Sequence, residues 1–394
     1  GSILEHCIVE YAGSYGSIPV IKNSTYINAC TFSNNTGNIV EMKFRTNEGD
    51  YSSSYPYTYP SSKITNSVFT NNSSGPLSIN GINTTTTGNT LINTGPIEIF
   101  AQGYDSGFNN SIYKSATISN NVLTNVISSR ASIFGYTSIL GNIVISNNLV
   151  SDNSQGAGII AGFTSGALLN EATISGNTVI RNGGSGIQIG DAFDLQQNGT
   201  VNLTGNSIAD NTGKGLYIHT RSSVNNIRYN KLHNNGGESS FNIMDDVVIY
   251  GGRDTIEYNT VTGGSASVDW GLLYFNSDPI VRYNNFIIGS QNYLLKADGY
   301  HASSPVAGVF DFGDNWLGTT DTTNLDALIY DWNDNATLDV VDYSSFLTAP
   351  NTTAPPAPPT NVAAQTGTTS IGLTWAANAE SDIAGYKIYY DTDQ

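Results

Sequence analysis

The chain has 394 residues, of which 39% are hydrophobic and only 12% are charged, and its formal net charge is −17. This charge argues against nucleic acid and anionic membrane surfaces as partners, because both attract Lys and Arg. No apolar run approaches the roughly 20 residues of a spanning helix, so we expect no membrane insertion.

A short pattern recurs from the first residues onward: an aliphatic residue, two further residues, a small polar residue, one residue, and a second aliphatic residue. It is clearest in the segments ATISGNTVIRN (172–182) and TVNLTGNSIADN (200–211). We call the polar position the anchor. Anchors recur about every 28 residues at variable intervals, as in a coil with loops of variable length. They are Cys7, Cys30, Ser67, Asn89, Asn121, Asn148, Asn177, Asn206, Asn230, Asn259, Asn284 and Asn315.

Each repeat unit is expected to contain three short strands. One leads into the anchor, a second follows it, and a third has the pattern Gly-aliphatic-x-aliphatic, as at 186–189, 215–218 and 271–273, with 241–244 as its counterpart in between. Strands this short bury their inward faces only by stacking on the next unit. The predicted fold class is therefore all-β, a right-handed parallel β-helix of about 11–12 coils over residues 1–348.

Stacking predicts that equivalent residues form columns, about 4.8 Å apart. Anchor amides would then hydrogen-bond along the stack, because a buried Asn needs partners. The neighbouring Cys7 and Cys30 are expected as a reduced pair, although their spacing also permits a disulfide. A second Asn ladder is predicted five residues after the anchors, at Asn35, Asn72, Asn153, Asn182, Asn211 and Asn235.

Two columns of charged residues alternate in sign, which favours ion pairs on the outer surface over a catalytic role. A column of tyrosines lies beside the second of them. The charged columns are Asp152, Arg181 and Asp210, then Arg228, Glu257 and Arg282, and the tyrosines are Tyr229, Tyr258 and Tyr283.

The repeats end at 314–318, and the segment 322–330 has the pattern of a short helix beginning at Asp321 or Thr322. Residues 316–348 are expected to cap the last coil, whose open edge would otherwise invite aggregation. A stiff Pro-rich linker at 349–359 follows.

Residues 360–394 alternate in polarity and predict three strands, at 361–363, 371–375 and 386–390. They resemble the N-terminal part of a fibronectin type III domain, with Trp375 as its core tryptophan. We therefore expect a partial β-sandwich and a chain that is a piece of a larger protein with additional domains.

The units ISGNTVIRNGGSGIQIG and LTGNSIADNTGKGLYIH resemble the parallel β-helix (PbH1) repeats of the pectin-lyase-like superfamily, over about residues 1–347. The resemblance implies the fold, which serves polysaccharide lyases, glycoside hydrolases, epimerases, phage tailspikes and non-catalytic surface proteins. Ser185 stands where the polygalacturonase branch has His, and the other catalytic motifs of that branch do not appear in corresponding places.

One set of ionisable residues is expected just after the third strand of successive units. Carboxylates beside a His and an Arg would suit calcium binding or acid–base chemistry on an acidic glycan. The alternative is that polar residues gather wherever strands turn into loops. The candidate catalytic residues are Asp191, His219, Arg221, Asp245 and Asp246.

Two other patches are candidates for binding. Asp331, Asn333, Asn335, Asp339 and Asp342 have the spacing of a calcium loop, although Ala336 stands where such a loop needs Gly, and an ordinary end of the β-helix is the alternative. A loop with several exposed tyrosines would stack on sugar rings, or pack on itself. These tyrosines are Tyr51, Tyr55, Tyr57 and Tyr59.

The sequence thus predicts a secreted, extracellular or cell-surface protein, a non-catalytic adhesive or structural rod that binds a polysaccharide or cell-surface glycan. The alternative is a polysaccharide lyase or glycoside hydrolase that uses the ionisable residues named above. Ca²⁺ is the one cofactor that the residue patterns suggest.

Overall fold

The structure is a computed structural model, and most of its regular structure is β-strand. The residues it describes are 2–13, 20–22, 24–43, 61–73, 75, 77–80, 83–101, 114–137, 140–163, 169–189, 199–219, 224–236, 245–250, 253–263, 270–275, 280–288, 293–297 and 308–388.

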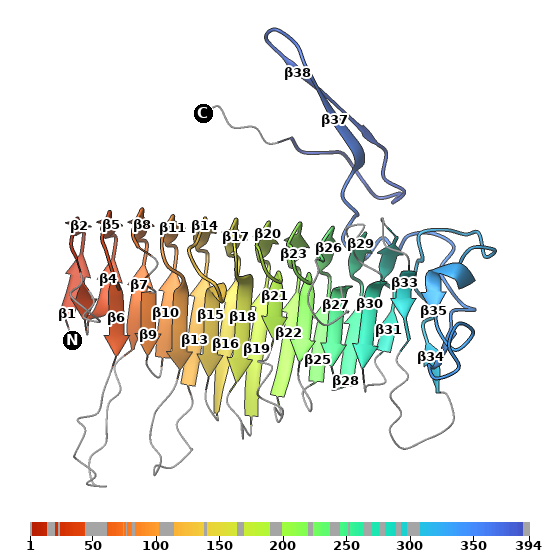
Figure 1. The fold of residues 1–394 in the computed structure, drawn as a ribbon, viewed down its shortest axis with the longest axis horizontal. Helices are drawn as coiled ribbons and strands as arrows, with labels where there is room; N and C mark the ends of the chain where they lie inside the picture. The colour runs from red at the N-terminus through yellow and green to blue at the C-terminus, as the bar shows by residue number, and fades with distance from the viewer. Residues whose placement is uncertain are drawn as a thin grey trace.

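The strands form three long parallel sheets of 11, 11 and 12 strands (Figure 1). The first sheet leads into the anchors and contains β1 (Ser2–Glu5), β4 (Ser24–Asn28), β7 (Ser62–Thr65), β10 (Asn83–Thr87), β13 (Lys114–Ser119), β16 (Leu140–Ser146), β19 (Leu169–Ser175), β22 (Gly199–Thr204), β25 (Val224–Arg228), β28 (Arg253–Glu257) and β31 (Ile280–Arg282).

The second sheet follows the anchors and has strands of three residues. It contains β2 (Ile8–Glu10), β5 (Thr31–Ser33), β8 (Val68–Thr70), β11 (Thr90–Ile92), β14 (Val122–Thr124), β17 (Leu149–Ser151), β20 (Thr178–Ile180), β23 (Ser207–Ala209), β26 (Lys231–His233), β29 (Thr260–Thr262) and β32 (Asn285–Ile287).

The third sheet completes each coil. It contains β3 (Ile21–Lys22), β6 (Val40–Lys43), β9 (Leu77–Asn80), β12 (Ile97–Ala101), β15 (Ala131–Thr137), β18 (Ala157–Phe163), β21 (Ile187–Ile189), β24 (Leu216–His219), β27 (Asp245–Tyr250), β30 (Trp270–Phe275), β33 (Tyr293–Lys296) and β35 (Ile329–Tyr330).

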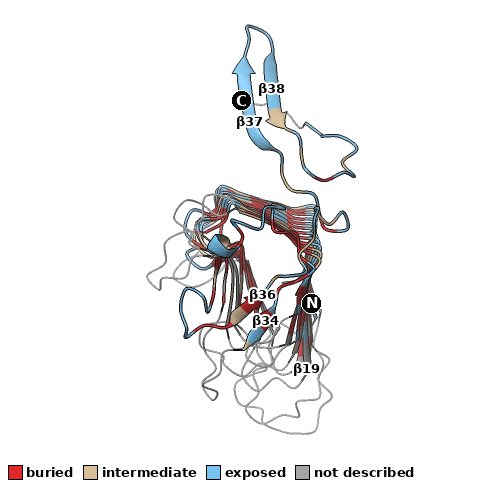
Figure 2. Ribbon diagram, turned by 90° about the vertical axis from the view of Figure 1, so that its right-hand side faces the viewer, coloured by how far each residue is buried: buried red, intermediate tan, exposed pale blue. Residues whose placement is uncertain are grey.

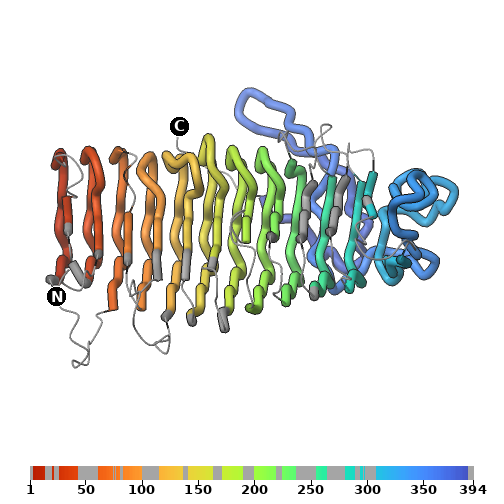
Figure 3. Tube along the Cα trace, turned by 60° about the horizontal axis from the view of Figure 1, so that its bottom comes forward, coloured from red at the N-terminus to blue at the C-terminus, as the bar shows by residue number. Residues whose placement is uncertain are grey.

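Neighbouring strands in each sheet lie one repeat unit apart in the sequence. Ile174 in β19 lies opposite Leu203 in β22, and Val179 in β20 lies opposite Ile208 in β23. The coils stack along the long axis of the molecule (Figure 3), and the view along that axis shows the three-sided outline of one coil (Figure 2). The predicted all-β fold class, a right-handed parallel β-helix with three strands per coil, is confirmed.

The core fills the inside of the coils. The inward side chains of the pairs just named are fully buried, and they belong to one continuous cluster that runs through the solenoid. Because each coil contributes the same inward positions, an inward side chain packs on its counterparts in the neighbouring coils.

A left-handed backbone position makes the turn between the first and second sheets. The residue directly before every anchor has a positive φ, a conformation that Gly adopts without cost and that Asn adopts more readily than most side chains. The residue types at this position vary too much for the repeat pattern to predict this conformation. The twelve residues are His6, Ala29, Asn66, Gly88, Asn120, Asn147, Gly176, Gly205, Tyr229, Tyr258, Tyr283 and Asp314.

One third-sheet strand is not where it was predicted. The strand that pairs in register with β24 is β27 (Asp245–Tyr250), whereas the predicted segment 241–244 lies outside the described residues. Segment 241–244 has apolar residues at alternate positions, and 247–250 is a continuous apolar run, which also suits a buried strand, so the pattern alone did not distinguish them.

The last coil ends in a cap. β35 adds to the third sheet, and β34 (Val309–Asp311) pairs with β36 (Val340–Asp342). The helix predicted over 322–330 is only a 3-10 turn, η1 (Asp326–Leu328), because the next residues pair as a strand with β33. Leu317, Leu325, Leu338 and Val341 are buried in this region and extend the core beyond the last complete coil.

The Pro-rich linker lies on the solenoid. The Asn285 side chain donates to the backbone oxygen of Asn351 at 3.0 Å and accepts from its backbone nitrogen at 2.7 Å. The Thr260 hydroxyl donates to the carbonyl oxygen of Pro355. The linker therefore follows the second sheet across β32 and β29.

Beyond the linker, β37 (Thr360–Thr366) and β38 (Ile371–Ala376) form an antiparallel hairpin whose residues are mostly exposed. The rings of Trp375 and Tyr386 pack edge to face, with their centres 5.0 Å apart. Residues 386–388 of the predicted third strand are not in a strand, and 389–394 lie outside the described residues.

Replacing Asn285 by Ala tests the docking of the linker. The variant loses both hydrogen bonds to Asn351, and we expect limited proteolysis to cut 349–359 several-fold faster, because each lost bond weakens docking by about 1 kcal/mol. Asn361→Ala, in the hairpin, is the control. Unchanged cleavage in Asn285→Ala would show that these bonds do not hold the linker.

Candidate functional site

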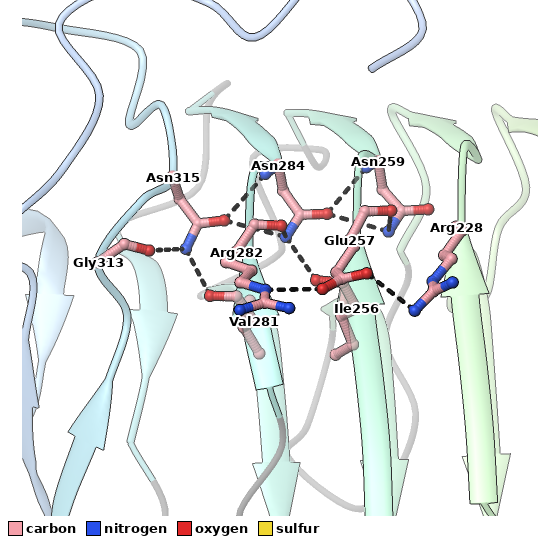
Figure 4. Close-up of polar contacts among 9 residues, drawn as sticks. All are labelled: Arg228, Ile256, Glu257, Asn259, Val281, Arg282, Asn284, Gly313 and Asn315. Carbon is pink, nitrogen blue, oxygen red and sulfur yellow. Dashed lines mark hydrogen bonds and ion pairs between the residues drawn. The ribbon is translucent and has the colours of Figure 1, made fainter. Parts of the chain in front are cut away.

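The anchor side chains form a hydrogen-bonded ladder along the whole solenoid. The backbone N–H of Asn259 donates to Oδ1 of Asn284 at 2.8 Å, and that of Asn284 donates to Oδ1 of Asn315 at 3.0 Å (Figure 4). The side-chain Nδ2 of Asn284 also donates to Oδ1 of Asn315 and to the carbonyl oxygen of Ile256. The same backbone-to-side-chain bond joins each anchor to the next from Cys7 to Asn315, which confirms the predicted ladder.

The two cysteines occupy anchor positions and are not bridged. The sulfur of Cys30 accepts from the backbone N–H of Cys7 at 3.3 Å, the place that Oδ1 takes elsewhere, and the backbone N–H of Cys30 donates to Oγ of Ser67. Burial raises the pKa of Cys30, which favours the thiol over the thiolate. The predicted reduced pair is confirmed.

The second Asn ladder exists in two runs. Asn35 donates to Asn72 through both its backbone N–H and its Nδ2, and a second run joins Asn182, Asn211 and Asn235 in the same way. Asn153 extends this second run through its backbone N–H alone, because its Nδ2 donates to the carbonyl oxygen of Ala157. In the two coils between these runs, buried Thr94 and Val126 take the equivalent positions and interrupt the column of amides.

Both predicted charge columns form ion pairs. Arg181 makes two hydrogen bonds to Asp152, at 2.7 and 2.9 Å, and this contact lowers the pKa of Asp152. The carboxylate of Glu257, with a side-chain exposure of 6%, binds Arg228 at 2.9 Å and Arg282 at 2.7 Å (Figure 4).

The carboxylate is more deeply buried in the Glu257 column than in the Asp152 column, so we expect variants of the two columns to lose different amounts of free energy of unfolding. Glu257→Gln leaves two guanidinium groups without their shared carboxylate, and we expect a loss of about 2 kcal/mol in the free energy of unfolding. Asp152→Asn breaks an exposed pair and is expected to lose less than about 1 kcal/mol. Chemical denaturation measures both, and equal losses would contradict the role that we assign to burial.

Three tyrosines form a stack beside the ion pairs. The rings of Tyr229 and Tyr258 are 5.4 Å apart and inclined by 9°, and those of Tyr258 and Tyr283 are 5.4 Å apart and inclined by 19°. The guanidinium of Arg282 lies 5.3 Å from the centre of the Tyr283 ring. All three tyrosines occupy the left-handed position before an anchor. They therefore form an aromatic ridge along the edge between the first and second sheets.

Three of the five predicted catalytic residues have described backbones, and these three do not lie at one level of the third sheet. Tyr250, at the end of β27, pairs with His219 at the end of β24, whereas Asp245 is the first of the 6 residues of β27, about 16 Å away along the strand. Asp245 and Asp246 thus lie at the opposite end of the third sheet from His219, because the strand begins where it was predicted to end.

Several other candidates lie outside the part of the chain that the structure describes. Asp191 and Arg221 are among them, and only the backbones of His219, Asp245 and Asp246 are described. The tyrosine loop with Tyr51, Tyr55, Tyr57 and Tyr59 is also outside the described residues.

The predicted calcium loop uses its side chains to hold the backbone of the cap. The Asp331 carboxylate accepts from the backbone N–H groups of Asn333 and Val341, and Asp339 accepts from Gly308 at 2.7 Å. Asn335 accepts from Thr337, and Asp342 accepts from Ser344, which lowers the pKa of Asp342. This arrangement gives no support to calcium binding.

Nor do other side chains gather as metal ligands in the described ranges, which contain no group of three or more His, Cys, Asp or Glu residues suited to a metal ion. Within the same ranges, no helix has the length and apolar character needed to cross a membrane.

One buried acid was not among the predicted candidates. Asp254 in β28 is 2% exposed and points into the core, where its Oδ1 accepts from Nδ2 of Asn225. Its Oδ2 has no hydrogen-bond partner among the described residues. Burial raises the pKa of Asp254 to about 7. The group lies inside the solenoid and bears on stability, not on ligand binding.

Comparison with known proteins supports the fold. Residues 80–246 match the family model described as "Right handed beta helix region". A search of curated proteins and a search of solved structures each found no match.

Proposed function

We propose that this chain is part of a secreted or cell-surface rod without catalytic activity, which binds a polysaccharide or cell-surface glycan in an adhesive or structural role. The observation that carries the proposal is the anchor ladder, which is unbroken from Cys7 to Asn315. Because hydrogen bonds join each coil to the next, the solenoid resists local bending and local unfolding. With a spacing of about 4.8 Å between neighbouring coils, twelve coils form a rod roughly 55 Å long. Such a rod presents the same surface positions at regular spacing, which suits an extended chain of sugars.

We also propose membership of the pectin-lyase-like superfamily. The anchored repeat units and the three-sheet coil support it. For residues 360–394 we propose the beginning of a fibronectin type III domain, supported by the hairpin β37–β38 and by the contact of Trp375 with Tyr386. The extracellular location rests on these two resemblances and on the low content of charged residues.

The alternative, a polysaccharide lyase or glycoside hydrolase, loses support from the register of the third sheet. Two carboxylates that act on one glycosidic bond lie about 5–10 Å apart, and their partners must reach the same bond. Asp245 and Asp246 are separated from His219 by the length of a strand, and this separation weighs against a single site that contains all three.

A single assay tests both functions. The intact chain is incubated with a panel of acidic and neutral glycans, and new reducing ends, unsaturated products and retention on each glycan are measured. Retention without products is the expected result. Products would overturn the non-catalytic assignment, and neither retention nor products would overturn glycan binding.

A further inference from the structure

The occupants of the left-handed column change abruptly in the middle of the solenoid. Asn147, Gly176 and Gly205 are followed in successive coils by Tyr229 and the rest of the aromatic ridge. Gly205 and Tyr229 are direct neighbours, because Thr204 pairs with Arg228 and the N–H of Gly205 donates to the oxygen of Arg228. One face of the Tyr229 ring is covered by Tyr258. The other face points toward the coil of Gly205.

The space over Gly205 is open. A Cβ placed there would meet no described atom nearer than the backbone nitrogen of Gly176, at 4.0 Å. Over Gly176 itself, Oδ1 of Asn147 lies where such a Cβ would be, so that glycine is already covered. The result is a notch one coil wide, about 4.8 Å, with the Tyr229 ring as one wall. Tyr229 is 42% exposed, as an uncovered wall requires.

The turn itself does not require tyrosine. Tyr229, Tyr258 and Tyr283 have φ values of 57°, 56° and 60°, and a bulky side chain in this conformation costs about 1–2 kcal/mol, whereas Gly or Asn makes the same turn in most other coils. The two stacked ring pairs return about 0.5–1.5 kcal/mol each, which offsets only part of that cost. Strain of this kind in consecutive coils points to a role outside folding.

We propose that the notch formed by Gly205 and the exposed face of Tyr229 is a subsite for one pyranose ring of a neutral glycan chain. The inference rests on the proposed function and deepens it. A pyranose presents an apolar face of C–H groups, which packs on an aromatic ring. A pyranose on the exposed face of Tyr229 would therefore extend the stack of tyrosine rings at nearly the spacing between those rings. Thr204, an exposed residue that directly precedes Gly205, is the candidate hydrogen-bond partner of a sugar hydroxyl.

The charges favour a neutral ring. Arg228, which directly precedes Tyr229, is bound to Glu257, and the same carboxylate binds Arg282. The chain as a whole carries a net charge of −17, which repels an acidic polysaccharide. The subsite therefore differs from the acidic-glycan chemistry considered for Asp191, His219 and Arg221.

The test measures binding of the full chain to hexasaccharides of cellulose, xylan and mannan by calorimetry, with a hexamer of galacturonic acid as the acidic comparison. Tyr229→Asn removes the ring and keeps a residue that tolerates the turn. Gly205→Asn fills the notch with a side chain found at the same position in other coils. We expect each to weaken binding of the preferred neutral hexasaccharide about ten-fold or more.

Tyr283→Asn is the matched control, because it removes a ring from the far end of the ridge and leaves the Tyr229 face unchanged. It should bind within about two-fold of the original chain. If the chain binds a neutral hexasaccharide and neither Tyr229→Asn nor Gly205→Asn weakens that binding, the proposed subsite is wrong and the proposed function stays intact. Binding of the acidic hexamer alone would overturn the neutral assignment, and no binding to any of the four would count against glycan binding itself.

Discussion

Asn177→Ala is expected to lower the free energy of unfolding by about 3–5 kcal/mol. Oδ1 of Asn177 accepts from the backbone N–H and the side-chain Nδ2 of Asn148, and its Nδ2 donates to Asn206 and to the carbonyl oxygen of Ile145. The site is fully buried, so water does not replace the lost partners. Alanine leaves donors and acceptors unpaired on both neighbouring coils, and chemical denaturation measures the loss.

The natural ladder supplies the comparison. Ser67 occupies an anchor position and accepts from the backbone N–H of Cys30, so Asn177→Ser should restore one bond and lose less stability than Asn177→Ala. Asn202→Ala, on the outer face of the first sheet, should change stability by less than about 1 kcal/mol. Equal losses in the alanine and serine variants would show that cavity formation, and not the broken ladder, destabilises the chain.

The ladders could be predicted from sequence because anchor spacing sets the register of every coil. Once Asn177 and Asn206 are aligned, Arg228, Glu257 and Arg282 fall in one column, and the structure confirms their contacts. The same alignment puts Asp254 in a column with Val201, since each lies five residues before an anchor, so a carboxylate at an apolar position can be read from the sequence as well.

Other features could not be predicted from local patterns. The choice between 241–244 and 245–250 as a strand depends on loop length, which varies from coil to coil. The contact of Asn285 with Asn351 joins segments far apart in the chain. A Pro-rich composition predicts that the linker is stiff, but it does not predict the surface on which the linker lies. The notch at Gly205 arises from the absence of a side chain beside Tyr229, which is visible only after the coils are stacked.

Asp254 is an inward carboxylate of the first sheet, and no described cation is paired with it. Its column holds Ala172 and Val201 in earlier coils, and its immediate neighbour is the uncharged Asn225. A single hydrogen bond from an amide compensates poorly for the lost hydration of a charge. The native state therefore favours the protonated acid, in line with a pKa of about 7.

This shift makes stability depend on pH in a defined direction. Below about pH 4 the acid is protonated in both the folded and the unfolded chain and imposes no cost. Between about pH 4 and 7 only the unfolded chain ionises, so stability falls as pH rises, and above about pH 7 the penalty is constant. A difference of roughly three pKa units corresponds to a penalty on the order of 4 kcal/mol.

Asp254→Asn removes the ionisable group and should be more stable than the original chain by about 4 kcal/mol at pH 8, with the difference closing toward pH 4. The new amide can pair with Asn225 as the anchor amides pair with one another. Denaturation of both proteins from pH 4 to pH 8 measures the difference, and Asp382→Asn, at an exposed position, controls for loss of a charge. A gain that is the same at every pH would mean that packing, and not ionisation, limits stability at this position.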